Sequence, residues 1–212
     1  MSAKGDDVTQ KKGPTRGELR RQAMLDAATE LFLEKGFAST SLSDIVSRSK
    51  GSRSTLYEQF GNKEGLLRAM VEEVSADIWQ VIGPEDASLR DEEALVDVAR
   101  RFVHAAIAPR NLAVYRILVA EGPRMPEIAQ LFFDLGPRRL YGQLAARFRV
   151  SCQPFRISAT PERTAQLFLG AVMGVFHLVS VLGLDPKPTA EDIDAHVREA
   201  VRLFLDGVGR PG

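Results

Sequence analysis

The sequence predicts an all-α protein of about nine or ten helices, with a small N-terminal unit of three helices before a larger helical domain. Along most of the chain, apolar residues recur at the spacing of three and four that places them on one face of a helix. Glycine and proline pairs, such as Gly83-Pro84 and Gly136-Pro137, interrupt this pattern. No β-hairpin signal and no internal repeat is visible, so an isolated strand would have no partner.

The N-terminal unit begins after residues 1–16, which we expect to form a disordered basic arm because they contain few large apolar residues. Three amphipathic patterns follow in residues 17–35, 41–49 and 53–60. Ser41 and Asp44 have the spacing of a capping box at the start of the second helix. Gly51 interrupts the pattern, and Ser52 can cap the third helix. Residues 17–62 therefore predict a helix-turn-helix.

The rest of the chain is expected to be helical as well. Residues 63–84 predict one long connecting helix that ends at Gly83-Pro84. Residues 85–212 predict a second domain with helices at 88–108, 110–120, 126–135, 138–150, 161–182 and 189–208. Proline or glycine closes most of these helices, including Gly136-Pro137 after the third of them.

The composition is that of an ordinary globular chain, with 44% hydrophobic and 26% charged residues and 28 basic against 28 acidic side chains. The balanced charge excludes a histone-like polycation. Cys152 is the only cysteine, which excludes an intrachain disulfide, and no secretion signal is visible. We therefore expect a cytoplasmic protein.

Motifs of catalysis are missing from the sequence. None of the three histidines lies in a Glu-x-x-His or His-Glu-x-x-His pattern, so metal-binding helices lack their ligands. A serine nucleophile elbow, a Walker loop and a strand-following Gly-x-Gly-x-x-Gly are also absent. We expect no catalytic residue, no metal and no cofactor. A helical small-molecule enzyme or carrier remains a remote alternative.

The segment from Arg20 to Val71 resembles the DNA-binding domain of the TetR/AcrR family of bacterial transcriptional regulators. About fifty residues match in order and spacing. The matching runs are Ala27-Ala28-Thr29-Glu30-Leu31-Phe32, Lys35-Gly36-Phe37, Thr40-Ser41-Leu42-Ser43-Asp44-Ile45, Ser52-Arg53-Ser54-Thr55-Leu56-Tyr57 with Phe60, and Lys63-Glu64-Gly65-Leu66-Leu67. One departure is visible in the turn, where the family has glycine followed by an aliphatic residue and this chain has Lys50 before Gly51.

The resemblance implies a set of DNA-binding residues. Thr40, Thr55, Tyr57 and Lys63 match family positions that touch phosphate, and Arg53 and Ser54 match positions near bases. Ser41, at a helix N-terminus, is expected to help hold the phosphate backbone. Two plainer interpretations stay open: Tyr57 as a core aromatic and Arg53 as a solvated charge.

The N-terminal part of the chain is slightly more basic than the rest, as expected for a DNA-binding domain. Residues 1–65 carry 11 basic and 9 acidic side chains, and residues 66–212 carry 17 and 19. Two interpretations stay open for the basic residues Lys11, Lys12, Arg16, Arg20 and Arg21: a solvated tail and helix start, or an arm along the phosphate backbone or minor groove. Because the asymmetry is small, binding must depend on where a few basic groups lie.

The run from Leu167 to Leu184 contains no charged residue over eighteen positions, which is the threshold length of a membrane span. It contains several glycines and lacks an aromatic belt, so we favour a helix that is buried on all sides. In the family, such a penultimate helix packs on both its own domain and the twin subunit. With the amphipathic last helix it predicts a homodimer through a four-helix bundle; the alternative is plain intrachain core.

The larger domain resembles, less closely, the C-terminal domain of a subset of the family, and is expected to bind a small, largely apolar effector between its helices. The candidates for lining the pocket are Trp79, Phe102, His104, Tyr115, Leu118, Phe133, Met173, Phe176 and His177. His104 and His177 are the expected polar contacts. The alternative for each candidate is ordinary core packing.

These observations predict a DNA-binding transcriptional regulator. We expect a repressor that binds a palindromic operator as a dimer and is released by its effector. The alternative within the same fold is an activator or a DNA-binding protein that responds to no ligand.

Overall fold

The computed structural model describes residues 13–82, 89, 91–151 and 159–209, and within these residues it contains helices and no strand. This confirms the all-α prediction. The helices are α1 (Arg16–Lys35), α2 (Leu42–Ser49), α3 (Arg53–Phe60), α4 (Lys63–Ile82), α5 (Glu92–Ala106), α6 (Pro109–Glu121), α7 (Pro126–Phe133), the π-helical turn η1 (Asp134–Arg138), α8 (Arg139–Ser151), α9 (Pro161–Met173), α10 (Phe176–Leu182) and α11 (Ala190–Gly209). Residues 1–12, the bulk of the predicted arm, lie outside the described residues.

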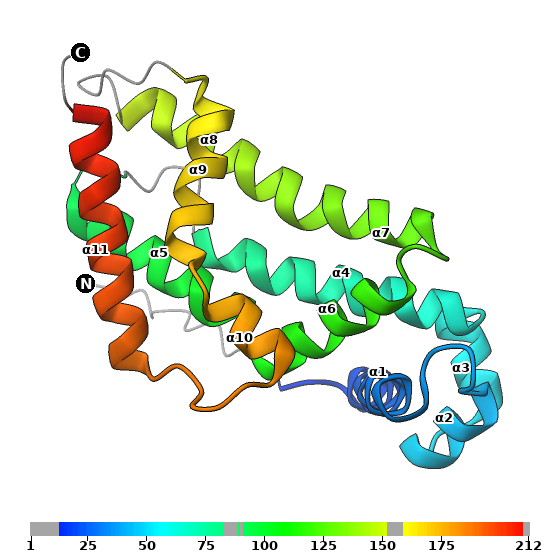
Figure 1. The fold of residues 1–212 in the computed structure, drawn as a ribbon. Helices are drawn as coiled ribbons and strands as arrows, with labels where there is room; N and C mark the ends of the chain where they lie inside the picture. The colour runs from blue at the N-terminus through cyan, green and yellow to red at the C-terminus, as the bar shows by residue number, and fades with distance from the viewer. Residues whose placement is uncertain (1–12, 83–88, 90, 152–158, 210–212) are drawn as a thin grey trace, which may run out of the picture.

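Helices α1–α3 lie together at one end of the molecule, and α4 leads away from them into the larger helical assembly (Figure 1). Side chains cap each start: the Thr15 hydroxyl accepts from the Glu18 amide, the Ser41 hydroxyl from Asp44 and the Ser52 hydroxyl from Thr55. A cap satisfies one of the backbone amides that a helix start leaves without a partner. The expected capping box of α2 is confirmed, because Asp44 also accepts from the Ser41 amide.

The sequence prediction that Gly136-Pro137 stops a helix is wrong. Pro137 lies inside η1, through which α7 continues into α8 as one rod (Figure 1). Proline has no amide hydrogen and its ring crowds the preceding turn, so the chain widens locally into a π-turn and then resumes the α-helix. The indole nitrogen of Trp79 in α4 donates to the Leu135 carbonyl of this turn at 3.1 Å and so links the turn to α4.

The single helix predicted over residues 161–182 is in fact two helices. Gly174 has φ +51°, and α9 and α10 meet at an angle of 58°. A Cβ on Gly174 would lie 2.7 Å from Nε2 of His196, so only glycine fits beside α11 at the bend. After the bend, α10 reaches α6, where Arg116 donates to the carbonyls of Ser180 and Val181 at 2.7 and 2.8 Å.

Within the described residues, no single helix has both the length and the apolar composition of a membrane span. The bent pair α9–α10 meets that test by length and composition taken together.

Two hydrophobic cores fill the molecule. The first lies between α5, α8, α9 and α11 and includes Phe148, Phe168 and Val197. The second is built by α1–α4, but side chains of α6 and α7 such as Ile117 and Ile128 also belong to it. Helices α6 and α7, which the sequence assigned to the C-terminal domain, thus pack against the helix-turn-helix. A ligand held between the two cores would touch the support of the N-terminal unit directly.

Candidate nucleic-acid interface and effector pocket

Helix α3 turns one face outward and holds the domain with the other. Leu56 and Phe60 are buried, whereas Arg53 and Ser54 of its first turn are exposed. The Arg53 guanidinium donates to the Ser43 hydroxyl of α2 at 2.6 Å, so it already lies beside the other helix of the motif. A first turn of this kind suits contacts to base edges and phosphates, since it presents short polar side chains and free backbone amides.

Tyr57 lies on the outward face of α3 with 56% of its surface exposed. The interpretation of Tyr57 as a core aromatic is therefore wrong. Thr55 is only half-buried, and its hydroxyl lies 2.8 Å from that of the capping residue Ser52. Ser41 is exposed at the start of α2. The structure thus brings Ser41, Arg53, Ser54, Thr55 and Tyr57 to the α2–α3 unit with polar groups at or near its surface.

The turn between α2 and α3 places Lys50, and not a glycine, in the left-handed region, with φ +53°. The Lys50 amide donates to the Ser47 carbonyl and the Gly51 amide to the Val46 carbonyl. This pair of bonds is a Schellman motif, in which the left-handed position is usually glycine. Gly51 meets a different demand, because a Cβ there would overlap the end of the buried Met24 side chain.

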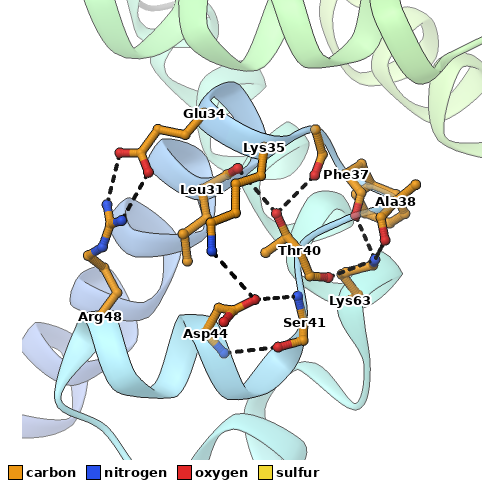
Figure 2. A network of polar contacts seen from close by, with 11 residues as sticks. Leu31, Glu34, Lys35, Phe37, Ala38, Thr40, Ser41, Asp44, Arg48 and Lys63 are labelled. Carbon is orange, nitrogen blue, oxygen red and sulfur yellow. Dashed lines mark hydrogen bonds and ion pairs between the residues drawn. The ribbon is translucent and has the colours of Figure 1, made fainter.

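Thr40 and Lys63 lie inward and support the motif (Figure 2). Thr40 is 2% exposed, and its hydroxyl faces the carbonyls of Leu31 and Gly36 at 3.1 and 2.9 Å. The Lys63 ammonium donates to the carbonyls of Phe37, Ala38 and Thr40 at 2.6, 3.2 and 2.9 Å. A hydroxyl has one proton and an ammonium three, so in this conformation neither side chain has a donor left for a phosphate.

Ion pairs fix α2 against α1 (Figure 2). Arg48 donates to Glu30 and, with both terminal nitrogens, to Glu34. This bonding holds the pKa of Glu34 below its ordinary value and raises that of Arg48. Bonds from Ser41 lower the pKa of Asp44, which also lies 4.0 Å from Lys35. The charge of Arg48 is thus paired with carboxylates of α1.

A cavity of about 170 Å³ lies where the two cores meet. Its lining comes from helices α4 to α10 and is mostly apolar and aromatic, as in typical small-molecule sites. The lining residues are Val74, Ile78, Phe102, Ala106, Asn111, Tyr115, Phe132, Pro137, Leu140, Tyr141, Met173 and His177. Of the candidates from the sequence, Phe102, Tyr115, Met173 and His177 line this cavity.

The other five candidates lie elsewhere. Trp79 donates a hydrogen bond to η1, and Leu118 is buried in the second core, which is built by α1–α4. Phe133 is exposed, Phe176 packs edge-on against His196, and His104 is exposed on α5. His104 therefore does not line this cavity and is not a polar contact in it.

Asn111 and Tyr141 are polar lining residues that were not among the candidates from the sequence. Asn111 is buried, and its amide nitrogen donates to the Ala105 carbonyl at 2.7 Å. Its position was detectable, because Asn111 shares the i, i+3, i+4, i+7 face of α6 with Val114, Tyr115 and Leu118. The rings of His177 and Tyr115 pack edge to face with a centroid distance of 4.5 Å. Burial lowers the pKa of His177, which favours its neutral form.

An ionic cluster joins the cavity to the helix-turn-helix. Glu73 of α4 accepts from Arg21 of α1 and from Arg110 of α6. Arg110 adjoins Asn111 and also lies 3.8 Å from Asp77. The Arg21 guanidinium lies 5.3 Å from the ring centre of Phe60, the last residue of the recognition helix. Any movement of α1, α4 and α6 relative to one another would therefore change these ion pairs.

The last three helices carry exposed apolar side chains. This apolar surface is formed by α9, α10 and α11, and its large exposed residues are Leu167, Val175, Leu178, Leu182 and Leu203. Leu167 and Leu203 also line a shallow groove between α9 and α11. Exposed apolar patches of this kind mark contact sites with other molecules.

An exposed recognition helix, carried by a three-helix unit and joined to a helical domain with an apolar cavity, defines a helix-turn-helix transcriptional regulator. Comparison with known proteins agrees. A model described as bacterial regulatory proteins of the tetR family matches residues 24–70. A second, described as the C-terminal domain of AefR-like transcriptional repressors, matches residues 93–207.

The HTH-type transcriptional repressor Rv3405c of Mycobacterium tuberculosis is 31% identical over 198 residues, 92% of this chain and 94% of that protein. The solved structure of the flavonoid-responsive regulator FrrA is 30% identical, covers 89% of this chain and 96% of its own, and has a TM-score of 0.68. That of SmeT from Stenotrophomonas maltophilia is 25% identical, covers 91% of each chain and has a TM-score of 0.63. The chain belongs to the TetR family and is a DNA-binding transcriptional regulator, as the sequence predicted.

Proposed function

We propose that this regulator is a repressor that binds a palindromic operator as a homodimer and is released by a small, largely apolar effector. Relatives named as repressors, Rv3405c and SmeT, support the direction of control. Operator DNA lies in the cytoplasm, where we place the protein, and its role there is regulatory and not enzymatic.

The observation that carries the proposal is the exposed first turn of α3. We expect the exposed Arg53 and Ser54 to contact bases, and Ser41, Thr55 and Tyr57 to contact the phosphates on either side. Thr40 and Lys63 keep the motif rigid and do not touch DNA. An arginine that reads a base favours guanine, whose O6 and N7 accept its two parallel donors.

Two-fold symmetry follows from the operator and from the apolar surface of α9–α11. Dimeric helix-turn-helix proteins place their recognition helices about one helical turn of DNA apart, roughly 34–36 Å. An isologous contact through α9, α10 and α11, of which α9 and α11 lie on the side away from α3 in Figure 1, would set this separation. The same contact would cover the bent pair α9–α10, which explains its lack of charge without a membrane.

Release requires only that the effector prefer the conformer whose recognition helices do not match the half-sites. The cavity at the junction of the two cores is the place from which such a preference reaches α4. The description of FrrA as flavonoid-responsive supports an organic small molecule as the signal.

The proposal is tested by footprinting on the DNA that flanks the gene, followed by titration of the protected site with Arg53→Ala. Loss of one base contact should cost about 1–3 kcal/mol and relax sequence preference at one position of each half-site. Arg101→Ala, which removes an exposed arginine from α5, is the control and should leave binding unchanged. Equal operator affinity of Arg53→Ala and Arg101→Ala would refute the proposed interface.

A further inference from the structure

We infer that the effector is an uncharged compound with a single aromatic ring and a hydrogen-bond donor, and that Oδ1 of Asn111 accepts from this donor. The inference rests on the proposed function, because it specifies which molecules the cavity between the two cores binds.

The acceptor is defined by the surroundings of Asn111. The carbonyl of Ala105 can only accept, so the amide nitrogen of Asn111 must face it, and the 2.7 Å bond fixes the side chain in this orientation. The remaining atom, Oδ1, is buried and has no hydrogen-bond partner among the described residues. Asn111 lines the cavity, so a donor on the occupant can pair with Oδ1 and remove the free-energy cost of a buried, unpaired acceptor.

The size of the cavity matches an occupant with one ring. Its volume is about 170 Å³. An apolar cavity of roughly 150 Å³ in another protein holds one benzene molecule. A ring with one or two small substituents therefore fills this cavity, whereas a fused polycyclic compound would extend beyond it through its open side.

The walls favour an aromatic occupant. Phe102, Phe132 and Tyr141 line the cavity together with Tyr115 and His177, and Tyr115 lies 6.1 Å from Phe132 between ring centres. Aromatic rings gain from edge-to-face and offset contacts beyond the area they bury. A ligand ring can make such contacts with walls on α5, α6, α7 and α8.

The occupant must also be neutral. No aspartate, glutamate, lysine or arginine is among the lining residues. His177 is the one lining group that could become a cation, and burial opposes its protonation. A carboxylate in the cavity would lose its hydration without gaining a counter-charge, which is far more costly than burying a hydroxyl.

Three probes test these requirements on the full-length wild-type protein by calorimetry. They are 4-methylphenol, p-xylene, in which a methyl replaces the hydroxyl, and 4-methylbenzoate. We expect 4-methylphenol to bind at least about 5-fold more tightly than p-xylene, because p-xylene leaves Oδ1 unpaired, and 4-methylbenzoate not to bind. Equal binding of the first two, tighter binding of the benzoate, or no binding of any probe would overturn the inference.

Variants then assign the acceptor. In Asn111→Leu the ratio of the two dissociation constants should fall to about one, and in His177→Phe it should persist. Each ratio is measured within one variant, so a general loss of stability does not imitate the result. Loss of the preference in His177→Phe alone would show that the imidazole is the acceptor of the ligand hydroxyl and would overturn the role of Asn111.

Operator binding of the unliganded protein is measured separately. Its absence would refute the proposed function, whereas the three titrations alone decide the chemistry of the ligand.

Discussion

The ammonium group of Lys63 joins the start of α4 to the segment between α1 and α2 through three carbonyls. It also lies 4.6 Å from the ring centre of Phe37. Thr40 supports the same segment from the interior. These contacts fix the position of α2 relative to α4, and therefore the angle at which the recognition helix is presented.

Lys63→Met should lower the free energy of unfolding by about 1–3 kcal/mol, because hydrogen bonds from a charged donor are lost and the stem is kept. Urea denaturation measures this change, and Lys187→Met, at an exposed loop position, is the control. Unchanged stability of Lys63→Met would contradict this role. If the salt dependence of operator binding also fell by the equivalent of about one phosphate, Lys63 would instead contact DNA, as the family resemblance implies.

His177 should make the protein less stable in mild acid. Its folded-state pKa lies below the ordinary histidine value of about 6.5, so below that pH the unfolded chain binds more protons than the native one. The stabilising contribution is therefore complete above about pH 6.5 and is lost as the pH falls through the folded-state pKa. Binding of 4-methylphenol should weaken over the same range.

Comparing wild type with His177→Phe between pH 7.5 and 5 measures this effect as the difference in unfolding free energy. The exposed His104, replaced by phenylalanine, is the control and should keep the wild-type pH dependence. If His177→Phe retained the full acid sensitivity, His177 would not be its source.

At the scale of elements, the turn of the helix-turn-helix requires one residue in the left-handed conformation and one residue without a side chain, and two neighbouring residues meet these requirements. Lys50 takes the left-handed position, and Gly51 allows the close approach of Met24. In a Schellman motif with glycine at the left-handed position, that residue carries no backbone strain. The displaced glycine of this sequence is thus accommodated by a strained lysine and a tight contact with α1.

Opposite effects are expected from two substitutions in this turn. Gly51→Ala should lower the unfolding free energy by about 1 kcal/mol, the low end of the cost of overpacking, because the group that must move is the terminal methyl of Met24. Lys50→Gly should raise it by up to about 1 kcal/mol, since relief of the left-handed conformation exceeds the added freedom of the unfolded chain. Thermal and urea denaturation of both variants check this, and the same sign of change in both would contradict the assignment.

The apolar surface on α9–α11 makes a further prediction at this scale. Leu203→Glu places a charge at a position that is 67% exposed in the single chain, so it should not disturb the fold. In the proposed dimer the charge would be buried, and sedimentation should show a monomer with weakened operator binding. An intact dimer of Leu203→Glu would place the interface elsewhere.

At the scale of the whole molecule, the two cores and the ions between them form one mechanical unit. The cavity adjoins α6, whose Arg110 shares Glu73 with Arg21 of the DNA-binding unit. Since α6 and α7 pack into the core of that unit, a displacement at the cavity reaches α1 and α3 through packed side chains and through this cluster.

Glu73→Gln should weaken the coupling between the two sites without removing either. We expect 4-methylphenol to bind with nearly wild-type affinity and to weaken operator binding less than in the wild type, by about 2- to 30-fold in the coupling factor. Gel-shift titrations with and without the probe measure this factor. Glu72→Gln, on the exposed side of α4, is the matched control. An unchanged coupling factor in Glu73→Gln would exclude the cluster from the pathway.

Local patterns in the sequence determined the helices, their caps and the recognition helix, because capping and amphipathic periodicity act between residues three or four apart. What only the tertiary structure decided depends on neighbours far along the chain. Lys63 donates to carbonyls 23 to 26 residues away along the chain. The turn that contains Pro137 accepts a hydrogen bond from the indole of Trp79, and the two bonded residues are 56 positions apart. At the bend, the ring of His196 leaves no room for a side chain on Gly174. The unpaired oxygen of Asn111 and the seam between the cores arose in the same way, because burial and hydrogen bonding are settled by packing between distant helices.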